Sequence, residues 1–165
     1  MHPRATEFKA RAEAEYDRTI DVREFPAGTK TAADAAGAIG CEPARIASSL
    51  AFRTPEIAVV VASGATRVNE AKLAGARGVP EEEVEMASPE EVQEVLGWSI
   101  GGVPPFAHDR EVPVYVDETL EAFEEVWAAA GTPRAVFPVA PADLWALANA
   151  ERIDVAESPT NGKNG

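Results

Sequence analysis

The sequence predicts a single α+β domain built on a mixed, curled β-sheet of about seven strands flanked by helices. Its 165 residues, 45% of them hydrophobic, are enough to bury the core of one domain. Several short apolar segments have strand character, yet they do not alternate with helices regularly enough for a doubly wound sheet. We expect the domain to span residues 1–157 and residues 158–165 to form a mobile polar tail.

The first part of the chain predicts two helices and a short strand. Residues 7–16 are rich in Ala and Glu, which favour helix. Apolar and polar residues alternate weakly over 20–25, as in a strand, and residues 26–29 are typical of a turn. Residues 31–34 match a capping box, so a second helix should follow and stop at Gly40.

The most strand-like segment comes next. After a helical turn at 43–46, residues 48–52 are expected to form a strand. Residues 57–62 are apolar at successive positions, and most are β-branched, which indicates a strand buried on both faces at the centre of the sheet. A turn should follow at 63–65.

Two capped helices are predicted around a short strand. Asn69 can cap a helix that runs to about residue 74 and is ended by Gly75 and Gly78. Residues 84–87 are expected to form a short strand. Residues 88–91, Ser-Pro-Glu-Glu, combine an N-cap, a proline at the first position and a capping box, and the helix they begin should end at Gly97.

The remaining elements lie in the last third of the chain. Residues 112–116 predict a strand, and Pro113 suggests that it lies at a sheet edge. Asp117 can cap a helix over 118–123, whereas residues 124–130 are compatible with helix or strand. The last predicted elements are a strand at 135–139, a helix at 141–149 and a strand at 153–155.

The charge balance limits the class of partner. The chain carries 28 acidic and 15 basic residues, a net charge of −13. Because nucleic-acid affinity comes largely from Lys and Arg, this balance argues against DNA binding over a broad surface. It is compatible with a small nucleic-acid end held in a pocket. Adaptation to high salt is an alternative source of the acidity.

Other classes are also disfavoured. No apolar run approaches the length of a membrane span, and the charged N-terminus has no secretory h-region, so a cytoplasmic protein is expected. The single cysteine, Cys41, cannot form an internal disulfide. Two histidines far apart and one cysteine do not make a zinc site, so no metal is expected.

Residues 97–108 form the strongest candidate for a functional loop. The segment contains two adjacent glycines and two adjacent prolines, and it ends with one of only two histidines. Glycines let a backbone approach a ligand, prolines fix a loop before anything binds, and rigid loops often carry binding groups. A Pro-rich connector between strands is the alternative interpretation.

Three segments occur in a distinctive order: IASSLAF at 46–52, VASGATRVN at 61–69 and GWSIGGVPPFAH at 97–108. Any one segment alone would be a weak signal. Taken in order, the three segments resemble the YbaK/EbsC family. This family includes the editing domain of bacterial prolyl-tRNA synthetase and its free-standing relatives. The similarity continues through 116–120 and 126–133 and covers roughly residues 32–155.

The resemblance implies a deacylase that hydrolyses the ester between a wrong amino acid and the 3′ end of a tRNA. It implies a free-standing enzyme acting in trans, on a tRNA for proline that carries a small wrong amino acid, with no metal and no organic cofactor. The family's Gly-x-x-x-Pro loop lines the aminoacyl pocket. Here that loop would be Gly101 to Pro105, with Gly102, Val103 and Pro104 between them.

The sequence departs from the family at one position. Relatives hold the ester near a lysine, and the corresponding residue here is Ser48. A serine can donate one hydrogen bond but brings no positive charge to a developing oxyanion. Lys72 is one replacement for that charge. Alternatively, backbone N–H groups and an ordered water suffice, or the fold kept the pocket and lost the reaction.

Gly101 and Gly102 are candidate oxyanion donors, because a glycine turn can point backbone N–H groups at a substrate; one such donor contributes about 3–4 kcal/mol in other enzymes. Their alternative role is a tight turn. His108 is a candidate to orient water or bind the terminal adenosine, and an exposed loop histidine is the alternative. The remaining candidate substrate contacts are Ser49, Phe52, Ser63, Gly64, Ala65 and Asp117, the last of which is also a candidate helix cap.

Two other functions compete with the deacylase. A non-catalytic module would use the same pocket to bind an aminoacylated or nucleotide-like ligand. An acidic domain with a protein partner is the third interpretation. The oligomeric state is left open.

Overall fold

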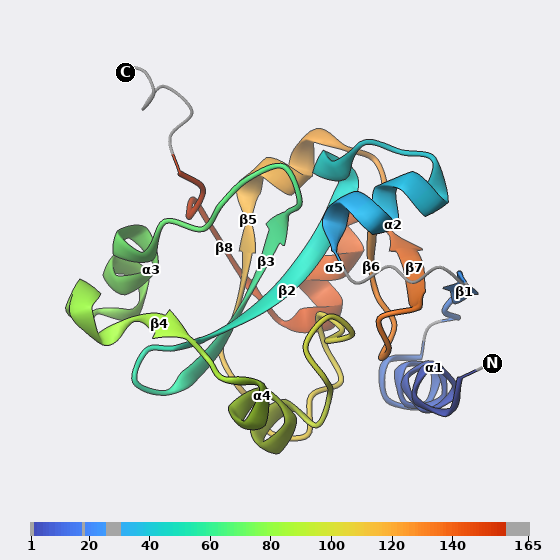
Figure 1. Cartoon of the computed structure of the whole chain (residues 1–165), viewed down its shortest axis with the longest axis horizontal. Helices are drawn as coiled ribbons and strands as arrows, with labels where there is room; N and C mark the ends of the chain where they lie inside the picture. The colour runs from blue at the N-terminus through green and yellow to red at the C-terminus, as the bar shows by residue number, and fades with distance from the viewer. Residues whose placement is uncertain (1, 18, 26–30, 158–165) are drawn as a thin grey trace.

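The computed structural model describes residues 2–17, 19–25 and 31–157. The predicted turn at 26–29 and the predicted tail at 158–165 lie outside the described residues. Figure 1 shows one twisted sheet with helices around it. The helices are α1 (Pro3–Tyr16), α2 (Ala32–Ile39), α3 (Glu70–Arg77), α4 (Pro89–Leu96) and α5 (Pro141–Ala148), with 3-10 turns η1 (Pro43–Arg45), η2 (Glu81–Glu83) and η3 (Glu118–Ala122).

The sheet is mixed, as the sequence predicts. Its order is β1-β7-β6-β2-β3-β5-β8, and β4 pairs with β2 off this path. β2 and β3 form an antiparallel hairpin, while the pairs β2–β6, β3–β5 and β5–β8 are parallel. The strands are β1 (Arg23–Glu24), β2 (Ile46–Arg53), β3 (Ile57–Ser63), β4 (Glu85–Met86), β5 (Val114–Asp117), β6 (Val126–Ala129), β7 (Ala135–Val139) and β8 (Glu151–Ile153).

Both faces of the sheet are covered, which explains the apolar sequence of β3. Val59 and Val61 belong to the larger core on one face, together with residues of α1, α4 and α5. Ala58 and Val60 face the opposite side and pack with Leu73 of α3. The prediction of a central strand at 57–62 is therefore confirmed, since β3 lies between β2 and β5.

Local sequence signals set most helix ends. Thr31, Asn69 and Ser88 each accept a hydrogen bond from a backbone N–H in the first turn of their helix, and Ser88 and Glu91 form the full capping box. α2 and α4 end at glycines with positive φ, Gly40 and Gly97, as predicted.

Several boundaries differ from the predictions. α3 continues through Gly75 to Arg77, and Gly78 is its C-cap. The predicted strand at 20–25 shortens to β1, and the last strand, β8, begins two residues earlier than predicted. The ambiguous segment 124–130 contains β6, a strand paired with both β2 and β7.

The prediction of an edge strand at 112–116 is wrong. β5 lies between β3 and β8. Pro113 precedes the strand, where its missing N–H breaks no ladder, and its carbonyl accepts a hydrogen bond from Val59 N at 2.9 Å. After β5, the predicted helix at 118–123 is the 3-10 turn η3.

None of the helices in the described residues is long and apolar enough to span a membrane.

Candidate functional site

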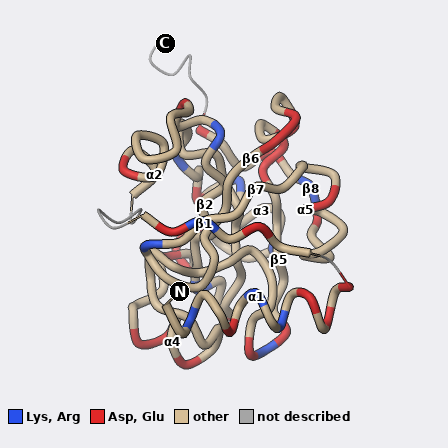
Figure 2. Tube along the Cα trace, turned by 90° about the vertical axis from the view of Figure 1, so that its right-hand side faces the viewer, with Lys and Arg blue, Asp and Glu red and all other residues tan. Residues whose placement is uncertain are grey.

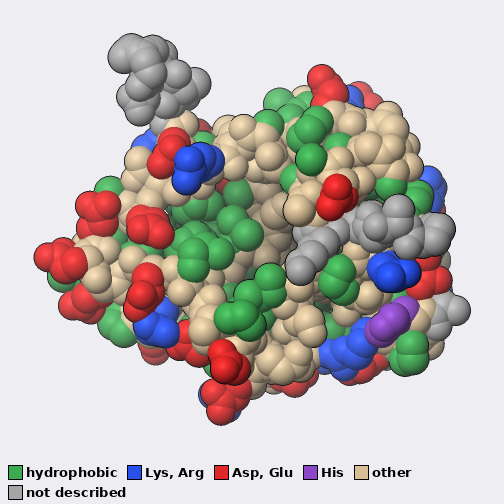
Figure 3. All heavy atoms as spheres, in the orientation of Figure 1, with side chains coloured by type: hydrophobic (Ala, Val, Ile, Leu, Met, Phe, Trp, Pro, Cys, Tyr) green, Lys and Arg blue, Asp and Glu red, His purple; other side chains and the backbone are tan. Residues whose placement is uncertain are grey.

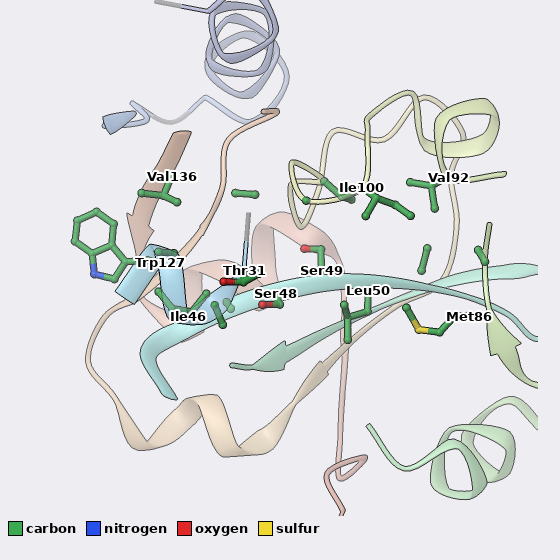
Figure 4. A pocket seen from close by; sticks show the side chains of 18 residues that line it. Thr31, Ile46, Ser48, Ser49, Leu50, Met86, Val92, Ile100, Trp127 and Val136 are labelled. Atoms are coloured by element: carbon green, nitrogen blue, oxygen red, sulfur yellow. The ribbon is translucent and has the colours of Figure 1, made fainter. Parts of the chain in front are cut away.

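A pocket of about 260 Å³ opens beside the middle of β2. Figure 4 shows its walls: β2 with Ile46, Ser48 and Leu50, the loop that carries Ile100, and β6 and β7 with Trp127 and Val136. The space-filling view shows a hollow on this face, with hydrophobic side chains gathered beside it and acidic side chains farther out (Figure 3). Met86 and Ile100, the two exposed large hydrophobic residues among those described, line the pocket.

The pocket lies where the sheet divides. On the side of β2 away from β3, β6 pairs only with Ile46 and Ala47. On the same side β4 pairs only with Phe52 and Arg53. Residues 48–51 therefore have no strand partner on that side within the described part of the chain. The gap exists because β6 diverges from β2 after Ala128 toward β7.

The wall formed by the glycine-proline loop contributes Gly101 and Val103. Gly101 has φ +91°, a left-handed conformation that favours glycine. Gly101 lines the pocket, and among the hydrogen bonds of the described residues none engages its backbone N–H.

Gly102 has a packing role instead. Its N–H donates to the carbonyl of Ser99 at 2.9 Å, so it is not available as an oxyanion donor in this conformation. A Cβ here would lie 2.7–2.8 Å from backbone atoms of Thr132, and the Gly102 carbonyl accepts from Gly131 N. The alternative role considered for Gly102, a tight turn, fits its hydrogen bond to Ser99, and the close approach to Thr132 is a further reason for glycine at this position.

The wall formed by α2 contributes Thr31, Ala32 and Ala35. Gly64 lets this helix approach the sheet, because a Cβ there would lie 2.5 Å from Ala32 Cβ and 2.6 Å from the Pro43 carbonyl. Gly64 therefore shapes the pocket from behind, without lining it.

Among the described residues, the lining carries no titratable side chain. Its hydroxyl groups belong to Thr31, Ser48 and Ser49, and Trp127 adds an indole N–H. Neighbouring strand residues point to opposite faces, so Ser48 and Ser49 diverge, as Figure 4 shows. Ser49 Oγ is buried without a hydrogen-bond partner in the described residues.

An ion pair beside the pocket fixes α4 to the end of β2. Arg53 donates to both carboxylate oxygens of Glu91, at 2.9 and 2.6 Å. These bonds, together with the Ser88 backbone N–H, lower the pKa of Glu91 to about 2. The pair holds the helix that places Val92 in the pocket wall.

His108 forms a hydrogen bond within the glycine-proline loop. Its Nε2 lies 2.8 Å from the carbonyl of Pro104, and since a carbonyl only accepts, this nitrogen carries the proton. Burial lowers the pKa of His108, with a further lowering by Arg11, against the opposing effects of Pro104 and Asp109. The ring is not part of the pocket lining.

The other predicted contacts lie apart from the pocket. Lys72 Nζ is 3.2 Å from both oxygens of Asp154 and donates to the Ala156 carbonyl, so its charge is held against the C-terminal segment. Asp117 is fully buried; it makes no side-chain cap, and its carboxylate accepts from Val155 N and Thr119 Oγ1.

The remaining predicted contacts have packing or connecting positions. Ser63 Oγ donates to the Ala44 carbonyl at 2.8 Å. Phe52 is buried in the core on the α3 face. Ala65 is exposed in a turn, and Pro104 and Pro105 are buried within the loop. Of the predicted set, the structure brings together Ser48, Ser49, Gly101 and Val103 around the pocket.

Sequence reasoning missed over half of the lining. Thr31 was identified only as a cap and Val136 only as a strand residue, while Trp127 and Ala129 lie in the segment 124–130, which was left open between helix and strand. The family resemblance includes 126–133, but no local signal marks these residues as pocket lining, because they reach the pocket through long-range pairing of β6 and β7. No group of three or more His, Cys, Asp or Glu residues able to hold a metal occurs in the described ranges.

Known proteins share this architecture. The sequence model of the aminoacyl-tRNA editing domain family matches residues 26–147, a range that contains every lining residue. The uncharacterized protein YwhH of Bacillus subtilis (strain 168) is 37% identical over 134 residues, which cover 79% of this chain and 82% of that protein.

Two further relatives have informative names. A proline–tRNA ligase of Bacillus pumilus (strain SAFR-032) is 32% identical over 102 residues, which cover 61% of this chain and 18% of the ligase. A crystal structure described as that of a candidate trans-editing enzyme for prolyl-tRNA synthetase superposes with a TM-score of 0.89 at 39% identity. The match covers 96% of this chain and 99% of that one.

Proposed function

The chain belongs to the aminoacyl-tRNA editing domain family, and we propose that it is a trans-acting deacylase that hydrolyses the ester of a mischarged tRNA. We propose that residues 1–157 act as one editing domain. The observation that carries the proposal is a small neutral pocket, inside the family-matched range, which Gly101 lines with a backbone N–H that has no hydrogen-bond partner among the described residues.

The pocket suits the chemistry of ester hydrolysis. Water attacks the acyl carbon, its oxygen forms a bond to that carbon, and the bond to the ribose oxygen breaks. Negative charge develops on the carbonyl oxygen, and the Gly101 N–H can donate to it. The proton of water leaves with the ribose oxygen, so the products are a free amino acid and a tRNA with a free terminal hydroxyl.

No lining side chain can act as the general base among the described residues. We therefore assign the orientation of water to backbone groups and to the hydroxyl of the substrate's own ribose. Ser48 can donate one hydrogen bond to this water or to the terminal nucleotide.

The proposed substrate is a tRNA for proline that carries a small wrong amino acid. The names of two relatives, a proline–tRNA ligase and a candidate trans-editing enzyme for prolyl-tRNA synthetase, support this choice of tRNA. The pocket's small volume and largely apolar lining support a small acyl group.

A binding module is the second candidate, and the neutral lining favours it. With Ser48 at the position of the family's lysine, no described side chain brings positive charge to the pocket. Such a module would hold an aminoacylated or nucleotide-like end without hydrolysing it.

The test is deacylation of alanyl-, seryl- and cysteinyl-tRNA for proline, at low and high salt. We expect hydrolysis above the spontaneous rate and its loss in Gly101→Val, because valine strains the left-handed backbone and fills the wall. Gly75→Ala is the matched control, since a Cβ at that helical position meets nothing within 4 Å. Binding without hydrolysis in any salt would support the module instead.

Ser48 is tested by two substitutions. Ser48→Ala should lower the rate if its hydroxyl orients water or substrate. Ser48→Lys restores a positive charge beside the pocket and should raise the rate. Equal deacylation rates in the wild type and both variants would show that Ser48 has no role in the reaction.

A further inference from the structure

The gap beside β2 exposes backbone groups that a sheet would normally pair. In an antiparallel ladder, the N–H and C=O of one residue point to the same side, and successive residues alternate between sides. The Ala51 carbonyl accepts from Ala87 N at 3.0 Å, on the side of β4. Ser49, two residues earlier, therefore points its N–H and C=O to that same side.

At Ser49, the side of β2 that faces away from β3 borders the pocket. Neither β6 nor β4 extends to Ser49 in the register of the described strands. Ser49 itself lines the pocket, and its hydroxyl is the only buried side-chain group in the lining without a partner among the described residues. Ser49 thus offers a backbone N–H donor and a backbone C=O acceptor, placed as they would be to pair with a neighbouring strand.

We infer that the aminoacyl group of the substrate pairs with Ser49 as a strand of one residue. The α-ammonium group donates to the Ser49 carbonyl, and the acyl carbonyl accepts from the Ser49 N–H. An aminoacyl ester has both groups on either side of one α-carbon, the spacing that a residue in a strand uses. This inference rests on the proposed function and names the chemistry by which the pocket recognises its ligand.

The pairing has two consequences for recognition. It uses only the α-ammonium group and the acyl carbonyl, which every aminoacyl ester has, so the other walls of the pocket must select for side-chain size. It also places the acyl carbonyl beside a backbone donor on the β2 wall, while Gly101 supplies a donor from the loop wall. Acyl groups without an α-amine lose one of the two bonds.

The experiment measures amide hydrogen exchange by NMR on the full chain. The probe is adenosine whose 3′-oxygen is replaced by an amide-linked L-alanine, which cannot be hydrolysed as an ester. In the free protein, the Leu50 amide should be protected by its pairing with Val60, and the Ser49 amide should exchange faster. Saturation with the probe should slow exchange at Ser49 at least about tenfold and leave Leu50 unchanged.

The matched ligands are the same compound with an acetylated amine and adenosine alone. Acetylation should weaken binding roughly tenfold or more, because it replaces the charged ammonium donor by one neutral amide N–H, which is a weaker donor. Equal affinity of the free and acetylated amines would overturn the inference, as would a bound probe that leaves Ser49 exchange unchanged. Absence of probe binding at millimolar concentration would also overturn it.

The outcomes separate this inference from the proposed function. If the probe protects Ser49 but no mischarged tRNA is hydrolysed, the pairing stands and the deacylase assignment fails. If tRNA is hydrolysed while the bound probe leaves Ser49 unprotected, the deacylase stands and the pairing fails.

Discussion

At the scale of single residues, two serines in adjacent strands have opposite environments. Ser63 Oγ donates to the Ala44 carbonyl and accepts from Ala65 N, and it ties η1 to the end of β3. Ser49 Oγ is also buried but has no partner in the described residues. A sheltered hydroxyl without a hydrogen bond destabilises the free protein, so its presence is better explained by ligand binding than by folding.

This contrast predicts opposite effects of alanine on stability. Ser49→Ala should leave the free energy of unfolding unchanged or raise it by up to about 1 kcal/mol, because it removes an unsatisfied group. Ser63→Ala should lower it by about 1–2 kcal/mol, because the Ala44 carbonyl loses its donor. Urea denaturation of both variants measures the difference. A loss at Ser49 as large as that at Ser63 would show that its hydroxyl has a structural partner.

His108 predicts a dependence of stability on pH. Burial lowers its pKa below the ordinary value of 6.5, so below pH 6.5 the unfolded chain binds the proton more readily than the folded protein. Stability should therefore fall as the pH drops from 6.5 toward the lowered pKa, and this contribution is absent above 6.5. The decrease between about pH 7.5 and 5.5 should be smaller in His108→Gln. An identical decrease in both proteins would contradict the assignment.

At the scale of elements, α1 supports the loop that forms one pocket wall, although it lies before the family-matched range. Phe8 packs at 5.2–6.2 Å between ring centroids against Trp98, Phe106 and Phe137. Arg11 donates to Asp109 and to the carbonyl of His108. The helix therefore contacts the loop near both of its ends.

Loss of this packing should loosen the loop as well as the core. Phe8→Ala should lower the free energy of unfolding by about 3–5 kcal/mol, the usual cost of removing a buried Phe side chain. It should also speed amide exchange over residues 97–108 more than in β3. Ala10→Gln, at an exposed position of the same helix, is the control and should change neither. Uniform destabilisation without faster loop exchange would argue against a supporting role.

At the scale of the whole molecule, the positive charges are largely neutralised within the chain. Figure 2 shows acidic residues spread over the surface, with basic residues among them. Among the described residues, this arrangement leaves few unpaired cations for phosphates, so the proposed tRNA substrate is expected to make few phosphate contacts. The described basic residues with ion-pair partners include Arg4, Lys9, Arg11, Arg23, Arg45, Arg53, Lys72, Arg77 and Arg152.

The charge distribution predicts a weak dependence of tRNA binding on salt. If only one or two phosphates are neutralised, the slope of log affinity against log salt concentration should be no steeper than about −2. The slope is obtained from the affinity of a tRNA analogue that carries a non-hydrolysable aminoacyl group, measured across a series of salt concentrations. A value near −5 would instead require a basic surface contacting the acceptor stem.

The sequence by itself determined the fold class, the mixed sheet, the central strand β3 and the capped ends of α2 and α4. These features follow from short-range chemistry: apolar runs, cap side chains and glycines with positive φ. It also identified the family through segments such as 97–108. Ser48, Ser49, Gly101 and Val103 were identified as site candidates in the same way, through the loop and strand that carry them.

Only the tertiary structure decided how the pocket is built. The divergence of β6 from β2 opens the gap at Ser49, and the close approach of Thr132 assigns Gly102 to packing. The same long-range contacts turn His108 inward onto Pro104 and place Lys72 against Asp154. Contacts between segments distant in sequence set these positions, and local residue patterns do not predict such contacts.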